Sequence, residues 1–351
     1  MSNSGMFKSL VLGALAMMAS VNAFAAPIEV KVVVVTMFEI GADSGDLAGE
    51  FQLWRERQKL DERIPFAHHH DLYLNRETGV LGMVTGMGTA NSATAVMALG
   101  LDPRFDLSKS YWLIAGIAGV DPADASIGSA AWAEYLVDGD LAHEIDAREI
   151  PADWPTGYFA RGTRKPYDPK RPESTGEMFR LNPKLTEWAY QRTRSIKLQD
   201  SPELQKTRAA FTGYPNAQKP PFVLKGDNLA GMTFWHGKLL NDWADQWVSY
   251  WTDRKGNFVT SAMEDTGSFQ ALTYLHPTRK IDKERVMVLR TASNYTMPPP
   301  GVSAAEHLLK ENEGYAGLQA SIEAAYQVGS AVVNEIASHW PKYREHTPGG
   351  E

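Results

Sequence analysis

"GVLGMVTGMGTANSATAVMALG", residues 79–100, decides the fold class of this 351-residue chain. It opens with an apolar run that stops at glycines, which is typical of a strand buried on both faces. After the glycine turn the residues follow helix spacing, with Thr89 or Asn91 available as the N-cap and Gly100 as the terminator. "YWLIAGIAG" (111–119) then has the pattern of a second buried strand. Strand, turn, helix and strand in this order form a βαβ unit, which predicts an α/β sheet with right-handed crossovers.

The same patterns continue on both sides of this unit. "EVKVVVV" (29–35) predicts another buried strand upstream. Further strands are expected at 129–141, 222–227, 256–264 and 285–293, and helices at 182–198, 237–251, 268–276 and 314–340. A stretch rich in proline, glycine and charge (144–172) begins an irregular excursion over 144–220. We therefore expect one large α/β domain over 26–351, with a mixed, mostly parallel sheet flanked by helices.

The composition excludes some classes of partner. The chain is 43% hydrophobic and 22% charged, which is ordinary for a globular protein with a sizeable core. A formal net charge of -7 argues against a nucleic-acid partner, because such partners usually require a basic patch. The chain has no cysteine, so an oxidising compartment would give it no disulfides.

The N-terminal segment (1–25) has the pattern of a secretory signal peptide. Lys8 precedes the apolar run "LVLGALAMMASV", and small residues follow, so cleavage is expected after Ala25 or Ala26. An uncleaved membrane anchor is the alternative, but the apolar run is short for a bilayer span. We find no later apolar stretch near the ~20 residues that a spanning helix needs. The sequence therefore predicts a periplasmic or secreted protein with no membrane span of its own.

Two motifs raise the question of an ion or anion site. The glycine turn "TGMGTANS" (85–92) can cradle a phosphate with its backbone N–H groups, but the local residues favour a tight strand-to-helix turn without a ligand. "AHHHD" (67–71) offers three imidazoles, yet consecutive side chains of a strand point to opposite faces and cannot converge on one ion. We interpret it as a surface loop, and we predict no metal and no cofactor.

Three polar or aromatic motifs follow predicted strands. "TFWHGK" (233–238) offers Phe234 and Trp235 for stacking on a base-sized ring, or a hydrophobic plug with His236 as a helix cap. "LRTASNY" ends a strand with polar groups where open α/β sheets bind ligands, although Asn294 also suits a turn.

"SAMEDTGSF" (261–269) sets Met263 beside two acids at the end of a strand. Desolvating a carboxylate is costly unless it is paired or hydrogen-bonded, so Glu264 and Asp265 need a reason to stand together. One interpretation is a capped helix start, in which Asp265 or Thr266 accepts from the first free N–H groups. The other interpretation is that these acids bind a ligand.

Longer blocks of the sequence resemble one family. "TGMGTANSATAVMALG", "LIAGIAGVDPADASIGS", "EIDAREIPADWPTGY" and "EDTGSFQAL" resemble the purine nucleoside permease family, and the match covers essentially all of the chain after the signal segment. That family is similar in fold to nucleoside phosphorylases and nucleosidases. The resemblance implies a nucleoside phosphorylase-like fold and purine nucleosides as partners.

The resemblance also implies roles for the acids. In the related enzymes a Met lies against the ribose and the next Glu accepts from both sugar hydroxyls, which gives these roles to Met263 and Glu264. The two oxygens of a carboxylate match a vicinal diol. Asn294 occupies the place of an acid near purine N7, and its amide suits a 6-oxopurine, so inosine or guanosine is favoured over adenosine. Glu39 resembles the acid with which nucleosidases activate water.

The remaining implied contacts lie around the sugar and the base. The residues proposed to contact the base are Phe234, Trp235, His236 and Asn294, and those on the sugar or anion side are Gly86, Gly88, Thr89 and Gly116. Phosphorylases hold phosphate with arginines near the first strand and on the "AGIAG" strand, and both segments lack arginine here. Arg161, Arg164 or Arg171 of the excursion would have to replace them, so phosphorolysis is disfavoured.

Three functions are consistent with these residues. The first is an exported purine nucleoside-binding protein that contributes to uptake through a separate membrane component, since a chain without a span cannot move a nucleoside across a bilayer unaided. The second is a purine nucleosidase that cleaves the N-glycosidic bond. The third is a protein that keeps the fold without the chemistry. The related folds also make a homo-oligomer a reasonable expectation.

Overall fold

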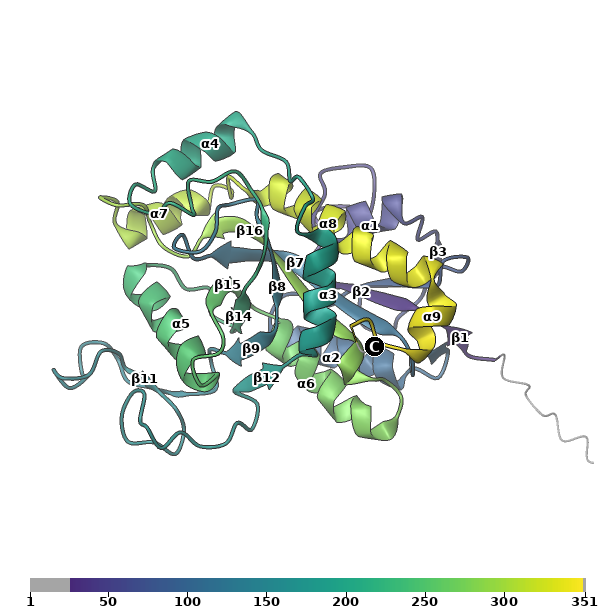
Figure 1. Cartoon of the computed structure of the whole chain (residues 1–351), viewed down its shortest axis with the longest axis horizontal. Helices are drawn as coiled ribbons and strands as arrows, with labels where there is room; N and C mark the ends of the chain where they lie inside the picture. Colours follow the sequence, from purple (N-terminus) through teal and green to yellow (C-terminus); the bar gives the residue numbers. More distant parts are fainter. Residues whose placement is uncertain (1–25, 350–351) are drawn as a thin grey trace, which may run out of the picture.

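Four neighbouring parallel strands form the centre of the molecule in the computed structural model, which describes residues 26–349 (Figure 1). In spatial order they are β5 (Val80–Val84), β2 (Val32–Thr36), β7 (Tyr111–Val120) and β16 (Val286–Tyr295). They correspond to the apolar runs from which the sheet was predicted. The predicted signal peptide lies outside the described residues.

Strand β7 has three neighbours. Its first residues, Tyr111–Ile114, pair with β2, and β16 runs parallel to it along the opposite edge. Where β2 has ended, β15 (Phe258–Ala262) takes over its edge and pairs antiparallel with Gly119 and Val120. This change of neighbour brings the ends of β2, β7, β15 and β16 together.

The rest of the main sheet extends to both sides and contains most of the antiparallel pairs. Its strands are β3 (Glu62–Ile64), β4 (Leu72–Asn75), β8 (Ala130–Ala133), β9 (Tyr135–Asp138), β12 (Met178–Arg180), β13 (Val223–Lys225) and β14 (Asp227–Ala230). Two separate pairs are β1 (Ile28–Glu29) with β6 (Phe105–Asp106), and β10 (His143–Glu144) with β11 (Tyr158–Phe159). The prediction of a mixed α/β sheet is confirmed.

Helices cover both faces of this sheet (Figure 1). The larger ones are α2 (Thr89–Leu101), α3 (Pro183–Thr193), α5 (Lys238–Trp251), α6 (Asp265–Leu275) and α8 (Leu318–Ser338). The shorter ones are α1 (Gln52–Arg57), α4 (Pro202–Ala209), α7 (Ala304–Glu311) and α9 (Trp340–Glu345), with two 3-10 turns at His276–Thr278 and Lys283–Arg285. Within residues 26–349 no helix is both long and apolar enough to traverse a bilayer.

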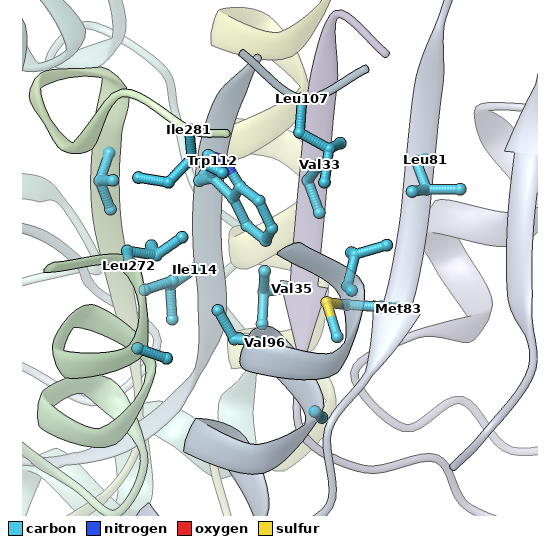
Figure 2. Close-up of a cluster of buried hydrophobic side chains, with 14 of the residues drawn as sticks. Val33, Val35, Leu81, Met83, Val96, Leu107, Trp112, Ile114, Leu272 and Ile281 are labelled. Carbon is cyan, nitrogen blue, oxygen red and sulfur yellow. The ribbon is translucent and has the colours of Figure 1, made fainter. Parts of the chain in front are cut away.

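The alternation of side chains along β2 divides the core between the two faces. Val33 and Val35 join the cluster beneath α2 and α6, together with Trp112 and Ile114 of β7 (Figure 2). Val32 and Val34, on the other face, pack instead under α1, α3 and α8. Burying one such side chain stabilises the fold by about 1.5–3 kcal/mol relative to leaving it exposed. These two clusters pack against opposite faces of the sheet and so fix the positions of the central strands.

Two predicted strands are each two strands in the structure. The run 129–141 breaks at Glu134 into β8 and β9, because the Asp227 carboxylate accepts from the backbone N–H groups of Glu134 (3.0 Å) and Tyr135 (2.7 Å). The run 222–227 breaks at Gly226, between β13 and β14, beside the break at Glu134. The chain changes its strand partners at both breaks. The prediction of single strands here was wrong.

The excursion over 144–220 is not a single irregular unit. Its first part, 144–172, contains the end of β10 and the short β11 with which it pairs, and projects from the body at the lower left of Figure 1. Downstream, β12 adds to the edge of β9, and α3 packs into the core cluster under α8. A Pro at N1 and an Asn182 cap, which accepts from two N–H groups, begin α3.

Candidate functional site

Arg290 is the centre of the candidate site. It lies in β16 opposite Gly116 of β7 and is 1% exposed. A Cβ on Gly116 would lie 2.8 Å from Arg290 Nη1 and 2.5 Å from Glu50 Oε1, closer than real Cβ atoms approach. Arg290 Nη1 also donates to the carbonyl of Ile117 at 3.0 Å. Glycine at position 116 therefore leaves the space in which the guanidinium and the carboxylate meet.

Two adjacent carboxylates pair with this guanidinium. Arg290 donates to Glu264 Oε2 at 2.9 Å, and its Nε lies 3.1 Å from both oxygens of Asp265. Burial alone would lower the pKa of Arg290, but the charges of Asp265, Glu264 and Glu50 outweigh it and raise that pKa above its ordinary value. The two acids stand together because they share one buried cation.

Glu264 is also held by the glycine turn that follows β5. Gly88 N donates to Glu264 Oε1 at 3.0 Å, and Met263 N lies 3.3 Å from Oε2. Thr89 Oγ1 donates to the Met263 carbonyl at 3.1 Å, and Ser92 Oγ donates to the carbonyl of Glu264 at 2.9 Å. The structure thus joins the predicted sugar-side loop to the predicted ribose-binding residues. The turn binds a carboxylate of the protein itself.

Glu50 is the third carboxylate of this cluster. It accepts from Met37 N (2.8 Å), just beyond β2, and from Ile117 N (2.7 Å) in β7. Burial raises the pKa of Glu50 to about 7; the positive charge of Arg290 works against this rise and the negative charge of Glu264 adds to it. A carboxyl group that titrates near neutral pH can accept a proton from a water molecule or a ligand.

Glu39 has a different set of partners from those that the resemblance implied. Its carboxylate accepts from the backbone N–H groups of Ile40 (2.8 Å), Gly49, Phe51 (2.9 Å) and Gln52 (2.5 Å). These bonds close the loop that leads into α1, where the orphan N–H groups of a helix need acceptors. Glu39 therefore organises the loop that carries Glu50, and it is Glu50 that reaches the cluster.

Asn294 lies on the same strand as Arg290, four residues further on. At the strand rise the two Cα atoms are no more than about 13 Å apart. The register shifts between Ala292 and Asn294, which leaves Ser293 in a bulge; Ser293 Oγ lies 2.9 Å from Asn294 Oδ1. The Asn294 side chain also hydrogen-bonds to Glu311. Both Asn294 and Glu311 line a cavity of about 100 Å³.

The three predicted base-contacting residues of 233–238 point to three different places. Phe234 is 44% exposed and stacks on Tyr315, with ring centroids 6.3 Å apart. Trp235 packs against Trp243 in the core cluster beneath α5. His236 is buried and lies beside His307 of α7. The structure does not bring Phe234 and Trp235 together as one stacking platform.

Exposed methionines frame the glycine turn. Met87 is 61% exposed and Met232 is 49% exposed, and a Cβ on Gly88 would lie 2.7 Å from Met232 Sδ. Gly86 and Gly88 both have positive φ, which permits this turn. Met87 and Met232 therefore place exposed apolar side chains at the turn that holds Glu264.

Two of the three arginines considered as phosphate ligands, Arg161 and Arg171, are paired with acids outside the cluster. Arg161 pairs with Glu177 at 2.8 Å, and Arg171 pairs with Asp253 at 2.8 Å. The histidine loop "AHHHD" forms turns, and His70 lies 2.7 Å from Asp43. No group of three convergent metal-ligand side chains within residues 26–349 includes this loop.

The sequence analysis missed Arg290 and Glu50. A signal for Arg290 was present, since a charge that interrupts the apolar strand "RVMVLRTAS" must be paired when buried. Glu50, in "LAGEFQLW", has no such signal, because its burial depends on how the loop after β2 folds back. Only the three-dimensional contacts identify it.

The family is decided by a sequence comparison. The sequence model described as Purine nucleoside permease (NUP) matches residues 29–348. The chain belongs to the purine nucleoside permease family. A purine nucleoside permease of Candida albicans is 29% identical over 278 residues, 78% of this chain and 68% of that protein. A probable purine nucleoside permease of Schizosaccharomyces pombe is 28% identical over 357 residues, 95% of this chain and 99% of that protein.

The fold of this purine nucleoside permease family member also resembles solved structures. A 5'-methylthioadenosine/S-adenosylhomocysteine nucleosidase of Neisseria meningitidis superposes with a TM-score of 0.51 at 14% identity, covering 87% of this chain and 99% of that one. At this identity the likeness concerns the fold alone. The predicted resemblance of the permease family to nucleosidases in fold is confirmed.

Proposed function

We propose that this protein binds purine nucleosides at the cluster around Arg290, with the ribose on Glu264. The observation that carries the proposal is the pairing of Glu264 with Arg290 at 2.9 Å in the interior, which fixes the position of the carboxylate. Among the described residues 26–349, Gly88 N is the one donor to Oε1 of Glu264, which leaves a lone pair for a sugar hydroxyl. Membership of the purine nucleoside permease family supports the choice of ligand.

Asn294 is the proposed contact for the base. Its amide lies on the same strand, lines the neighbouring cavity and can hydrogen-bond both N7 and a 6-oxo group. We expect Asn294→Asp to shift the preference from inosine toward adenosine, measured as the ratio of the two dissociation constants. An unchanged ratio would count against this role of Asn294.

We further propose that the protein is exported and contributes to nucleoside uptake. The segment 1–25 supports export, since it has the charge, apolar run and small residues of a signal peptide. Bound nucleoside would pass to a separate membrane component. Mass spectrometry of the N-terminus after expression in the native cell tests this: a chain that begins at Ala26 or Pro27 outside the cytoplasm is expected, and an intact Met1 inside it would refute export. Light scattering tests the expected homo-oligomer.

Hydrolysis of the nucleoside is a second candidate, favoured by Glu50. Its carboxylate, with a pKa of about 7, can take a proton from a water molecule that attacks the anomeric carbon. The N-glycosidic bond then breaks, and the purine leaves with the bonding electrons and takes up a proton from solvent. The oxocarbenium-like transition state would be stabilised by the negative charge of Glu264.

One experiment separates binding from catalysis. Purified protein is incubated with inosine, guanosine and adenosine, with and without phosphate, while bound nucleoside is followed by calorimetry and free base by chromatography. Binding without free base supports capture. Free base in both conditions supports the nucleosidase, and Glu50→Gln should then abolish turnover while nucleoside still binds. Free base only with phosphate would contradict the argument from the missing arginines.

A further inference from the structure

Three side chains from two separate segments converge outside the Arg290 cluster. They are His236, in the loop between β14 and α5, and His307 and Glu311 on α7. His236 Nε2 lies 3.0 Å from His307 Nδ1, and His307 Nδ1 lies 3.6 Å from Glu311 Oε1. His236 Nδ1 lies 3.7 Å from Glu311 Oε2. Nε2 of His236 therefore faces His307, and Nδ1 faces Glu311.

Two polar atoms of this group have no hydrogen-bond partner within residues 26–349. They are His236 Nδ1 and Glu311 Oε2. The side chains of these residues are 0% and 10% exposed, so water does not solvate them freely. An unsatisfied buried polar atom is destabilising, and a native structure usually provides a partner for it. A ring nitrogen without its proton and a carboxylate oxygen are both electron-pair donors, so a cation between them would satisfy both atoms.

Imidazole and carboxylate are both common ligands of transition metals. A cation that binds between these side chains takes the place of any proton that they share.

The geometry points to a divalent transition-metal site made by His236, His307 and Glu311. Metal–nitrogen and metal–oxygen bonds of about 2.0–2.2 Å in a tetrahedral site place ligand atoms roughly 3.3–3.6 Å apart. One ligand atom from each residue lies within 4.8 Å of the others. His307 and Glu311 are at i,i+4 on one helix face, as pairs of metal ligands on helices often are. Two imidazoles and one carboxylate suit Zn²⁺, Co²⁺ or Ni²⁺ rather than Ca²⁺ or Mg²⁺.

The fourth coordination position would face the cavity described above. His307 and Glu311 line that cavity, whose volume of about 100 Å³ can hold a water molecule or a small part of a ligand. Asn294 orients Glu311 by its hydrogen bond, as outer partners of metal-binding carboxylates do. Three protein ligands with one open position is the pattern of zinc sites that act on a ligand. This inference does not depend on nucleoside binding.

Sequence spacing gave no indication of this group, because His236 and His307 are 71 residues apart. They meet because α7 returns to the loop that precedes α5. Gly237, at the N-cap of α5 with a φ of 125°, sets the turn after His236, and its N–H donates to the carbonyl of Thr296 at 2.9 Å.

The test uses the full purified chain after treatment with a chelator and its removal. Zn²⁺ is titrated by calorimetry, Co²⁺ is followed by its visible absorption, and the melting temperature is measured with and without Zn²⁺. We expect one ion per chain, a Co²⁺ spectrum of a four- or five-coordinate site, and a higher melting temperature with Zn²⁺.

His307→Gln and Glu311→Gln should each weaken Zn²⁺ binding on the order of 100-fold. His339→Gln is the matched control, since His339 and Glu335 are also an i,i+4 pair at 3.4 Å, and no third ligand converges on them within the described part of the chain. It should leave binding unchanged. The metal site is overturned if the chelator-treated chain does not bind Zn²⁺, or if His307→Gln binds it as tightly as the parent chain does. The three side chains would then only share protons with one another.

Discussion

Arg290 and Glu264 lie 2.9 Å apart, with side chains that are 1% and 6% exposed. Neither charge is solvated, so each depends on the other and on the remaining carboxylates of the cluster. Asp265 and Glu50 are two further carboxyl groups around the one guanidinium. The site therefore carries an excess of negative charge, which suits hydroxyl donors and a developing positive charge better than a phosphate anion.

Arg290→Met should destabilise the fold strongly. The substitution keeps the apolar stem but leaves three carboxylates buried without their cation. We expect the free energy of unfolding in urea to fall by about 3–5 kcal/mol. Arg76→Met is the control, because the pair of Arg76 with Glu62 is exposed and should be worth at most about 1 kcal/mol. Equal losses in the two variants would contradict the assigned role of Arg290.

Glu264→Gln should separate binding from folding. The amide keeps the shape, and Arg290 still pairs with Asp265, so the loss of stability should be about 1–3 kcal/mol. The amide has one acceptor instead of two and loses the charge, so affinity for inosine should fall by roughly 10- to 100-fold. Calorimetric titration measures it, with Glu62→Gln as the control. Unchanged affinity would remove Glu264 from the sugar site.

The stability of the protein should depend on the protonation of Glu50. Its pKa is raised from 4.5 to about 7 in the folded state, so the folded state binds the proton more tightly than the unfolded one. This contribution to stability is fully present below pH 4.5 and is lost as the pH rises to 7, by about 3 kcal/mol. Arg290 and Glu264 are the charged groups that face it.

Glu50→Gln removes this contribution and so provides the measurement. Burial also raises the pKa values of Asp121 and Asp227, each to about 6, so the parent chain alone does not isolate Glu50. Between pH 5 and pH 8 the unfolding free energy of the parent should fall relative to that of Glu50→Gln. A difference that is constant with pH would show that Glu50 does not titrate in this range.

Gly88→Ala should weaken nucleoside binding as well as stability. Gly88 has a φ of 92°, and a new Cβ would lie 2.7 Å from Met232 Sδ while its N–H holds Glu264. Gly162→Ala is the matched control, because Gly162 has a φ of 79° but no atom within 4 Å of a new Cβ. Both should cost about 1–3 kcal/mol of stability in thermal or urea unfolding. Loss of inosine affinity in both variants, or in neither, would contradict a specific role of this turn.

The sequence was sufficient for the parts of the fold that depend on local patterns. The buried strand over 111–119 and the helix over 89–100 were predicted within two residues of their ends, because glycines and apolar periodicity mark them. The short helix α1 and the break at Glu134 were not predicted. A six-residue helix has little periodicity, and the break depends on Asp227, which is 93 residues away.

The candidate site shows the same division. Glu264 and Gly88 were selected from sequence motifs and are hydrogen-bonded in the structure. Glu39 was assigned a role by resemblance, but its carboxylate closes a loop and Glu50 reaches Arg290 instead. Two acids eleven residues apart in one loop cannot be distinguished by local pattern. The contact that decides between them is with β7, far along the chain.

Because β7 pairs with three strands, one of its edges stays unpaired for much of translation. A ribosome has completed β7 long before it reaches β15 and β16, which end at Ala262 and Tyr295. During that interval one edge of a ten-residue apolar strand has no partner, and such edges promote association between chains. Polypeptides truncated before Val286 should therefore aggregate rather than form a smaller stable unit.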